Sequence, residues 1–168
     1  MECRSEPTIQ LVTDHDLLAE AFHWSSDAPR WFRESEEHET LEEFLANADR
    51  CLFYGIFDGE MKALLRLTPF AQGVFAVDLF ARRSTDRELL TQAALSIQTY
   101  LYDREIANGF FGWIPTFNRS VRAIYARLGF QDSGVSCYRG KTHNRPVKWL
   151  LMVNSRNEEN GQKENNAD

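Results

Sequence analysis

The stretch Asn118–Phe130, "NRSVRAIYARLGF", reads as an amphipathic helix that ends at a glycine. Its apolar side chains recur at helical spacing: Val121, Ile124, Tyr125 and Leu128. A helix that only packs on a core needs neither an asparagine at its start nor a tyrosine in its middle. Tyr125 is therefore either a packed core residue or part of an active site.

Length and composition predict one folded domain. The chain has 168 residues, and 43% of them are hydrophobic, which is enough for a real core. The net charge of −6 argues against a dedicated nucleic-acid binder, whose phosphate contacts need clustered Lys and Arg. It does not exclude a local basic site.

The three cysteines favour a reducing compartment. Cys3, Cys51 and Cys137 are odd in number and far apart, so neither a disulfide framework nor a structural zinc site is expected. The histidines are not spaced as metal ligands, so no metal is expected. The first residues lack the apolar core of a secretory signal, and no apolar run is long enough to span a membrane. We expect a cytoplasmic protein without membrane contact.

The pattern of elements predicts a domain over residues 1–154 and a disordered polar tail over residues 155–168. Within the domain the order is strand, two helices, three strands, helix, strand, helix and two strands. Thr40 and Glu43 have the spacing of a capping box, and Asp58-Gly59 predicts a hairpin with a type I′ turn. The largely apolar Val74–Ala81 reads as a central strand. This order predicts an α+β fold with a mixed sheet.

With this order, the helix motif resembles that of the GNAT N-acetyltransferase superfamily. The resemblance covers roughly Thr8 to Val153, and the residues that match the motif are Asn118, Ala123, Tyr125, Arg127, Gly129 and Phe130, with Ala123 one place off the usual small position. It implies a GNAT-like α+β fold, with six to seven strands in a mixed central sheet and about four flanking helices. It also implies a site for acetyl-CoA.

The resemblance assigns roles to particular residues. Asn118 lies beside the pantetheine arm of acetyl-CoA in that family, and the Tyr125 hydroxyl would protonate the departing thiolate. Main-chain groups near Phe80 and Ala81 would orient the thioester. Asp78, the only charge in its strand, could act as a base or polarise a water. It could equally face solvent or pair with an arginine.

The family's phosphate loop is replaced here by "LFARRSTDRELL", which contains no glycine. Thr85 and Glu88 have capping-box spacing, and such a cap would occupy helix N–H groups that a pyrophosphate needs. Side chains could hold phosphate instead, and we assign this role to four residues: Arg82, Arg83, Ser84 and Arg87. The alternative is a solvated turn in which the arginines pair with Asp86 and Glu88.

Three further groups of residues could contact a substrate or a partner, and the resemblance places the first of them on the acceptor side. An acidic run suits a cationic amine or is a solvated helix face: Glu34, Glu36, Glu37, Glu39, Glu42 and Glu43. Trp24, Trp31 and Phe32 could line an acceptor pocket, cover the sheet or dock another protein. The late hairpin is basic and could touch phosphate, although a solvated turn is the simpler reading: Lys141, His143, Arg145 and Lys148.

Beside a weaker third possibility, a binding module that senses CoA or another nucleotide, two functions are consistent with these patterns. One is an acetyl-CoA-dependent N-acetyltransferase that acts on a small-molecule or peptide amine. The other is a non-catalytic GNAT-fold protein, because size and the glycine-poor loop are also similar to GNAT-like structural or head-assembly proteins of tailed bacteriophages. Its partners would then be other phage structural proteins, in the host cytoplasm or the virion.

Overall fold

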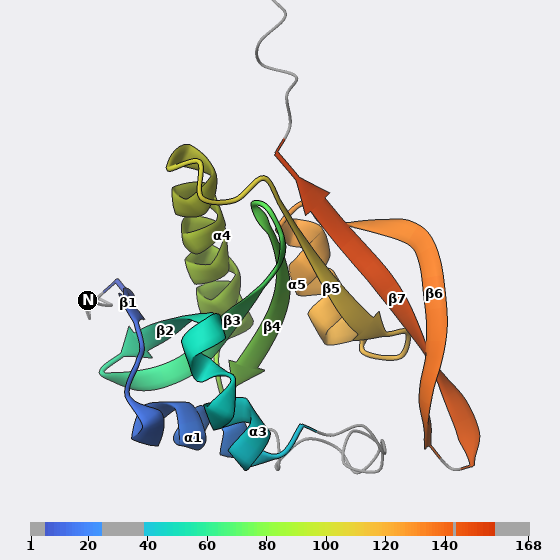
Figure 1. Ribbon diagram of the computed structural model, residues 1–168, viewed down its shortest axis with the longest axis horizontal. Coiled ribbons are helices and arrows are strands. Elements are labelled where there is room, and N and C mark those ends of the chain that lie inside the picture. The colour runs from blue at the N-terminus through green and yellow to red at the C-terminus, as the bar shows by residue number, and fades with distance from the viewer. Residues whose placement is uncertain (1–5, 25–38, 143, 157–168) are drawn as a thin grey trace, which may run out of the picture.

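The computed structural model describes residues 6–24, 39–142 and 144–156 (Figure 1). The elements run in the predicted order: β1 Thr8–Leu11, α1 His15–Trp24, α3 Leu41–Ala46, the short 3-10 helix η2 Ala48–Arg50, β2 Leu52–Asp58, β3 Glu60–Ala71, β4 Val74–Ala81, α4 Arg87–Asp103, β5 Gly109–Pro115, α5 Arg119–Arg127, β6 Gln131–Thr142 and β7 Arg145–Ser155. No helix within these ranges is long and apolar enough to cross a membrane.

All seven strands form one mixed sheet, in the order β1-β2-β3-β4-β5-β7-β6. Every neighbouring pair is antiparallel except β4 and β5, which are parallel and are joined by the crossover helix α4. The parallel pairing covers only three positions, from Val74 opposite Gly109 to Ala76 opposite Phe111. The two strands therefore part in the middle of the sheet, and Figure 1 shows β4 and β5 diverging there.

Helices cover both faces of the sheet, and each face has its own core. On one face α4 and α5 pack on the strands through residues such as Leu65, Ile97 and Ile124. On the other face α1 and α3 cover Phe53 and Leu64. Leu64 and Leu65 are neighbours in β3 and belong to different cores, because successive side chains of a strand point to opposite faces.

The predicted capping box at the start of α3 is confirmed. The Glu43 N–H donates to Thr40 Oγ1 at 3.2 Å, and the Thr40 N–H donates to Glu43 Oε2 at 2.8 Å. The two residues therefore satisfy each other's main-chain donors at the helix end.

The hairpin at Asp58-Gly59 is confirmed, but its turn differs from the predicted type I′. Only Gly59 has a positive φ, of 72°, whereas that turn needs positive φ at both central residues. A bulge between Ile56 and Phe57 shifts the register, so Asp58 pairs with Glu60 as a strand residue.

The end of β7 lies at the predicted domain boundary. Ser155 pairs with Gly109 in the sheet, and the Arg156 N–H donates to the Asn108 carbonyl at 3.1 Å. The strand therefore runs past residue 154. The remainder of the predicted tail, residues 157–168, lies outside the described residues.

Asn154 is a buried polar residue that joins three elements. Its Oδ1 accepts from the Tyr102 hydroxyl of α4 at 2.6 Å, and its Nδ2 donates to the Leu128 carbonyl at the end of α5 at 2.7 Å. Burial raises the pKa of Tyr102 to about 12, so the hydroxyl stays a donor at neutral pH. Asn154 therefore ties β7 to both helices of one face.

We expect Asn154→Ala to lower the free energy of unfolding by about 1–3 kcal/mol, because it leaves polar partners of a buried amide without their bonds. Urea unfolding of the variant beside Ser155→Ala, the exposed neighbour on the same strand, measures this. The Ser155 variant should change stability by less than about 0.5 kcal/mol. Equal losses in the two variants would contradict a role for the buried amide.

Candidate active site

Tyr125 fills the gap where β4 and β5 part. Its hydroxyl donates to the main-chain carbonyl of Val77 in β4 at 3.1 Å. Its ring lies against Gly112 of β5, where an added methyl group would come within 2.8 Å of Cε1. The side chain is only 5% exposed. Tyr125 is therefore both a packed residue and a polar group at the centre of the sheet. Packing in the core does not exclude a place in an active site.

The environment keeps the Tyr125 hydroxyl protonated. Burial raises the pKa of this hydroxyl well above its ordinary value, and the nearby carboxylate of Asp78 raises it further. At neutral pH the group is a hydrogen-bond donor. The same shift makes it a weak acid, able to give up its proton only to a developing anion in direct contact.

Beyond Ala76, the edge of β4 that faces the gap is not paired with β5. The Arg82 N–H donates across to the Lys62 carbonyl of β3 at 3.0 Å, so every second residue of β4 is bonded toward β3. Phe80 belongs to that set, and its ring packs against Phe44 at 5.5 Å. Leu79 and Ala81 alternate with it and direct their peptide groups to the gap. Leu79 carries no reactive group, so only the register identifies it.

Asp78 lies on the sheet face covered by α1 and α3, and it is paired. Its Oδ2 accepts from Arg66 Nε at 3.0 Å and from Arg66 Nη2 at 2.9 Å. Arg66 Nη1 also donates to Glu39 at 2.6 Å. The pairing agrees with the arginine alternative, yet the Asp78 side chain is 47% exposed, and its Oδ1 accepts no hydrogen bond from a residue that the structure describes.

Arg66 packs against two rings that also contact each other. Its guanidinium lies 5.3 Å from the centre of the Phe44 ring and 5.5 Å from that of Phe80. Of the acidic run, Glu39 joins this group, while Glu42 and Glu43 are exposed on α3. Glu34, Glu36 and Glu37 lie outside the described residues. Two carboxylates and one guanidinium leave a net negative charge beside the gap.

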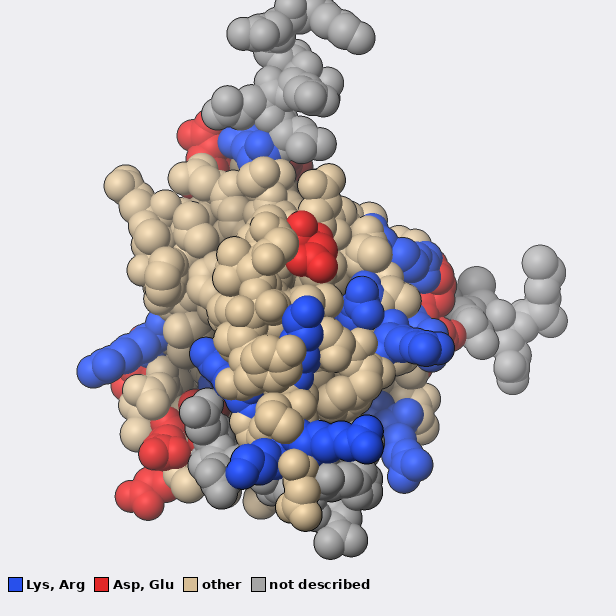
Figure 2. All heavy atoms as spheres, turned by 90° about the vertical axis from the view of Figure 1, so that its right-hand side faces the viewer, with Lys and Arg blue, Asp and Glu red and all other residues tan. Residues whose placement is uncertain are grey.

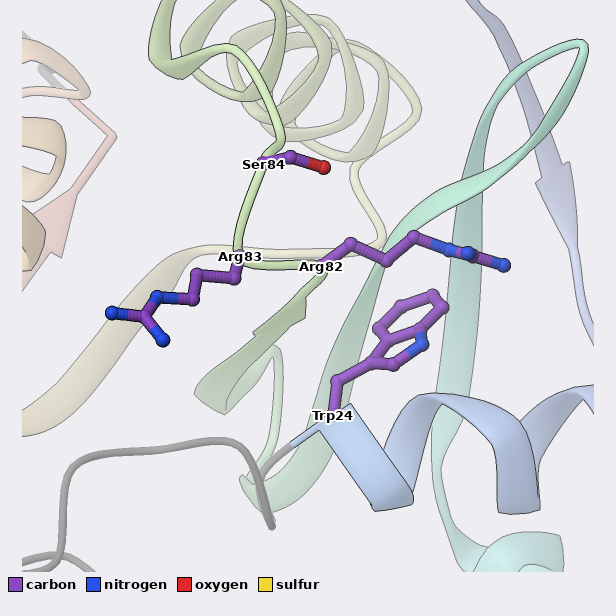
Figure 3. A pocket seen from close by; sticks show the side chains of 4 residues that line it. All are labelled: Trp24, Arg82, Arg83 and Ser84. Carbon is purple, nitrogen blue, oxygen red and sulfur yellow. The ribbon is translucent and has the colours of Figure 1, made fainter.

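The arginines that were predicted to bind phosphate do not all lie together. Arg82 pairs with Glu20 and, at 3.3 Å, with Glu60, and it lies 5.3 Å from the centre of the Trp24 ring. Arg83 extends in a different direction from Arg82, as Figure 3 shows, and neither Arg83 nor Arg87 has an ion-pair partner among the described residues. A hollow of about 340 Å³ is lined by Trp24, Arg82, Arg83 and Ser84. Trp31 and Phe32 lie outside the part of the chain that the structure describes.

The predicted Thr85–Glu88 capping box is wrong. The N-cap of α4 is Asp86, whose Oδ1 accepts from the Glu88 N–H at 2.8 Å. Thr85 instead donates its hydroxyl to the Lys62 carbonyl at 3.1 Å, because a turn closed by Thr85 N–H and Arg82 carbonyl brings it to β3. Glu88 pairs with Arg127 at 2.8 Å rather than with the predicted arginines. The start of α4 therefore carries a carboxylate in the observed cap, as it also would in the predicted capping box.

Asn118 has a local structural role. Its Oδ1 accepts from the Val121 N–H at 3.2 Å, so it is the N-cap of α5. Its amide N–H groups make no hydrogen bond to any residue that the structure describes. The cap therefore uses the amide oxygen and leaves the amide N–H groups without a partner among the described residues.

Comparison with known proteins identifies the fold. No family model and no curated protein matches the chain. Solved structures do match. A GNAT-family acetyltransferase from Streptococcus pneumoniae has a TM-score of 0.70 at 15% identity, covering 90% of this chain and 100% of that one. Ribosomal-protein-S5-alanine acetyltransferase from Vibrio fischeri has a TM-score of 0.69 at 9% identity, covering 92% and 95%. The yncA structure from Salmonella typhimurium, with its cofactor acetyl-CoA, has a TM-score of 0.67 at 12% identity, covering 92% and 96%.

The chain has the predicted GNAT-like α+β fold, with a mixed sheet of seven strands and, among the described residues, four flanking α-helices.

We expect Gly112→Ala to lower the free energy of unfolding by about 1–3 kcal/mol, because the added methyl group meets the Tyr125 ring. The loss should shrink by at least half in a Tyr125→Leu background, which removes the ring edge. Denaturant unfolding of the two single variants and the double variant gives this coupling energy. Additive losses would mean that Tyr125 does not fill the gap.

Proposed function

We propose that the protein is an acetyl-CoA-dependent N-acetyltransferase that acts on a primary amine. The observation that carries the proposal is the Tyr125 hydroxyl at the point where β4 and β5 part, in a chain with the GNAT fold. An acetyltransferase must place a donor beside the departing sulfur, and this hydroxyl is the buried donor at the gap. The presence of acetyl-CoA in one structure of the same fold supports the cofactor.

The reaction joins the amine nitrogen to the acetyl carbon and breaks the bond from that carbon to sulfur. The carbonyl oxygen gains negative charge as the nitrogen attacks, and main-chain N–H groups of Leu79 and Ala81 face the gap where it would develop. Tyr125 supplies the proton to the thiolate. Asp78, on the opposite face, takes the amine proton directly or through a water. Arg66, whose guanidinium packs against the Phe80 ring, holds the Asp78 carboxylate in place.

Phosphate binding rests on side chains in place of a glycine loop. Arg83 and Ser84 line the hollow beside the start of α4, and Arg87 is the first residue of that helix. An arginine can give two parallel hydrogen bonds to phosphate oxygens, which offsets the repulsion from Asp86. Arg82 lines the same hollow but contributes less, because Glu20 and Glu60 already neutralise it. Asn118 would donate its free amide N–H to the pantetheine arm.

The acceptor is proposed to be a small-molecule or peptide amine that arrives positively charged. The carboxylates of Asp78 and Glu39 lie on the face opposite to Tyr125, and they outnumber the single guanidinium of Arg66. An acceptor that enters from this face meets Asp78 before it reaches the gap. We place this activity in the cytoplasm, where acetyl-CoA is made.

A second candidate is a GNAT-fold protein without catalysis. The observation that favours it is the Asp86 carboxylate at the start of α4, where other proteins of this kind use bare N–H groups to hold phosphate. Its role as a bacteriophage structural or head-assembly protein, with other virion proteins as partners, remains a hypothesis from the sequence. Cofactor binding separates the two candidates.

We expect acetyl-CoA to raise the melting temperature, because a ligand at a hundred times its dissociation constant adds about 2.7 kcal/mol to folding stability. Arg83→Glu should reduce the shift at a fixed cofactor concentration, whereas Arg50→Glu, at an exposed arginine of η2, should leave it unchanged. Differential scanning fluorimetry with a titration of acetyl-CoA measures both. An unchanged melting temperature at millimolar acetyl-CoA would overturn the proposal of an acetyltransferase and favour the non-catalytic protein.

We expect Tyr125→Phe to lower kcat by about 10²–10⁴-fold, the usual contribution of a positioned acid, while the acetyl-CoA melting shift persists. Release of free thiol from acetyl-CoA, followed with a panel of amines, measures turnover. Because the hydroxyl also bonds Val77, unfolding of the variant is measured in parallel, and Tyr102→Phe serves as a matched control outside the gap. Full turnover in a folded Tyr125→Phe variant would exclude the acid role.

A further inference from the structure

Charge is distributed unevenly along the chain. Residues 115–156, which form α5, β6 and β7, carry eight basic side chains and one acidic one, Asp132. Residues 1–114 carry ten basic and twenty acidic side chains. Although the whole chain has a net charge of −6, residues 115–156, at one side of the sheet, are therefore strongly basic. Such asymmetry favours a polyanionic partner for that side.

The basic side chains gather on the face formed by β6 and β7. Figure 2 views the molecule from this side and shows Lys and Arg concentrated across its lower half, with an acidic side chain near the middle. Asp132 is engaged locally, because its Oδ1 accepts from the Gly134 N–H at 2.9 Å. Lys141, Arg145 and Lys148 are exposed and have no ion pair in the ranges that the structure describes.

The two strands form a twisted ribbon at the edge of the sheet, since β6 has only β7 as a neighbour. Tyr138 of β6 pairs with Lys148 of β7, and Lys141 pairs with Pro146 nearer the turn that joins the two strands. A bulge between Tyr138 and Lys141, where Gly140 has a φ of 62°, increases the local twist.

Helix α5 extends the basic surface. Arg122 Nη1 donates to the Thr116 carbonyl at 3.2 Å, and the Thr116 N–H donates to the Lys148 carbonyl at 2.9 Å. These two bonds place Arg122 next to the Lys148 and Tyr138 pair. We call the resulting set the ribbon surface: Arg122, Tyr138, Lys141 and Lys148, with Arg145 next to the turn between the two strands.

One exposed aromatic ring, that of Tyr138, lies among the charges of this surface. Tyr138 is 68% exposed, an unusual position for a large ring with no apolar cover. On the other face of the ribbon, the Arg139 guanidinium lies 5.4 Å from the centre of the Trp113 ring, and Trp149 Nε1 donates to the Arg139 carbonyl at 3.2 Å. Arg139 is thereby held in place, while Tyr138 offers a free ring face.

We propose that the ribbon surface binds single-stranded nucleic acid. Proteins that bind single strands combine basic side chains along the backbone with aromatic rings on which bases stack, and this surface has both. An acidic peptide would use the charges but not the exposed Tyr138 ring. A membrane-binding surface carries a continuous apolar face beside its basic residues, whereas Tyr138 is the single exposed large apolar side chain beside Lys141 and Lys148 among the described residues. The site is separate from the β4 and β5 gap, so it does not depend on the proposed acetyl transfer.

Fluorescence anisotropy of labelled short oligonucleotides tests the proposal with the full chain. We expect poly(U) RNA or poly(dT) DNA to bind at low salt, and the two probes show whether RNA or DNA is preferred. The logarithm of the binding constant should fall with the logarithm of salt concentration at a slope of about −0.7 per phosphate contacted, or about −3 for four contacts. A matched duplex should bind more weakly.

Variants locate the binding. Lys141→Glu with Arg145→Glu should weaken binding by about tenfold or more and flatten the salt slope, whereas Lys141→Arg should preserve both. Tyr138→Ala should weaken binding by roughly tenfold without changing the salt slope, because a stacked ring carries no charge. The control is Arg50→Glu with Arg104→Glu, two exposed arginines outside the ribbon surface, which should bind as the natural sequence does.

The proposal is overturned if the anisotropy does not change at low salt, or if the duplex binds more tightly than the single strands. It is also overturned if the control variant loses as much affinity as the Lys141→Glu with Arg145→Glu variant, or if Tyr138→Ala binds as tightly as the natural sequence. Poly-glutamate and phosphatidylserine vesicles are tested as competitors of the labelled strand. Displacement by either at a lower charge concentration than unlabelled poly(U) and poly(dT) would assign the surface to an acidic protein or a membrane.

Discussion

The parting of β4 and β5, held open by Tyr125, is the constraint on which the rest of the structure depends. A parallel pair that stops after three positions leaves main-chain groups without partners in the middle of a sheet, which is costly unless something polar fills the gap. Tyr125 donates to Val77, and its ring rests on Gly112. For the ring to lie there α5 must cross the sheet at that point, and Asn154 fixes the end of α5 to β7 and α4.

The surroundings of the gap differ sharply on its two sides. On the α1 and α3 side, Arg66 holds the carboxylates of Asp78 and Glu39 and leaves an excess of negative charge. At the start of α4, Asp86 occupies a helix N–H that a glycine loop would offer to phosphate. An anion can still bind there if arginine side chains offset one carboxylate, since a bidentate guanidinium bond is stronger than a neutral one. Arg83 has that freedom, whereas Arg82 is bound to two glutamates.

The segregation of charge gives the molecule two electrostatic regions. The acidic excess lies in residues before β5 ends, and the basic excess lies in α5 and the ribbon of β6 and β7. Electrostatic potentials of opposite sign on one surface steer different partners to different sides. A cationic amine and a polyanion would therefore approach the protein from separate directions.

Local patterns were enough to predict the order of the strands and α-helices, though not the 3-10 helix η2, because periodicity and capping depend on residues a few positions apart. They also predicted the capping box at Thr40, the hairpin at Gly59 and the helix that carries Tyr125. Side-chain partners were beyond such patterns. Asp86 caps α4 in place of the predicted Thr85, because the Thr85 hydroxyl donates to a carbonyl 23 residues away in sequence. Arg82 likewise pairs with Glu20, which is 62 residues away. The pairing of Asp78 with Arg66 and the orientation of Leu79 toward the gap follow from strand register. Register is set by the packing of whole faces, so only the folded chain fixes which polar groups meet at the site.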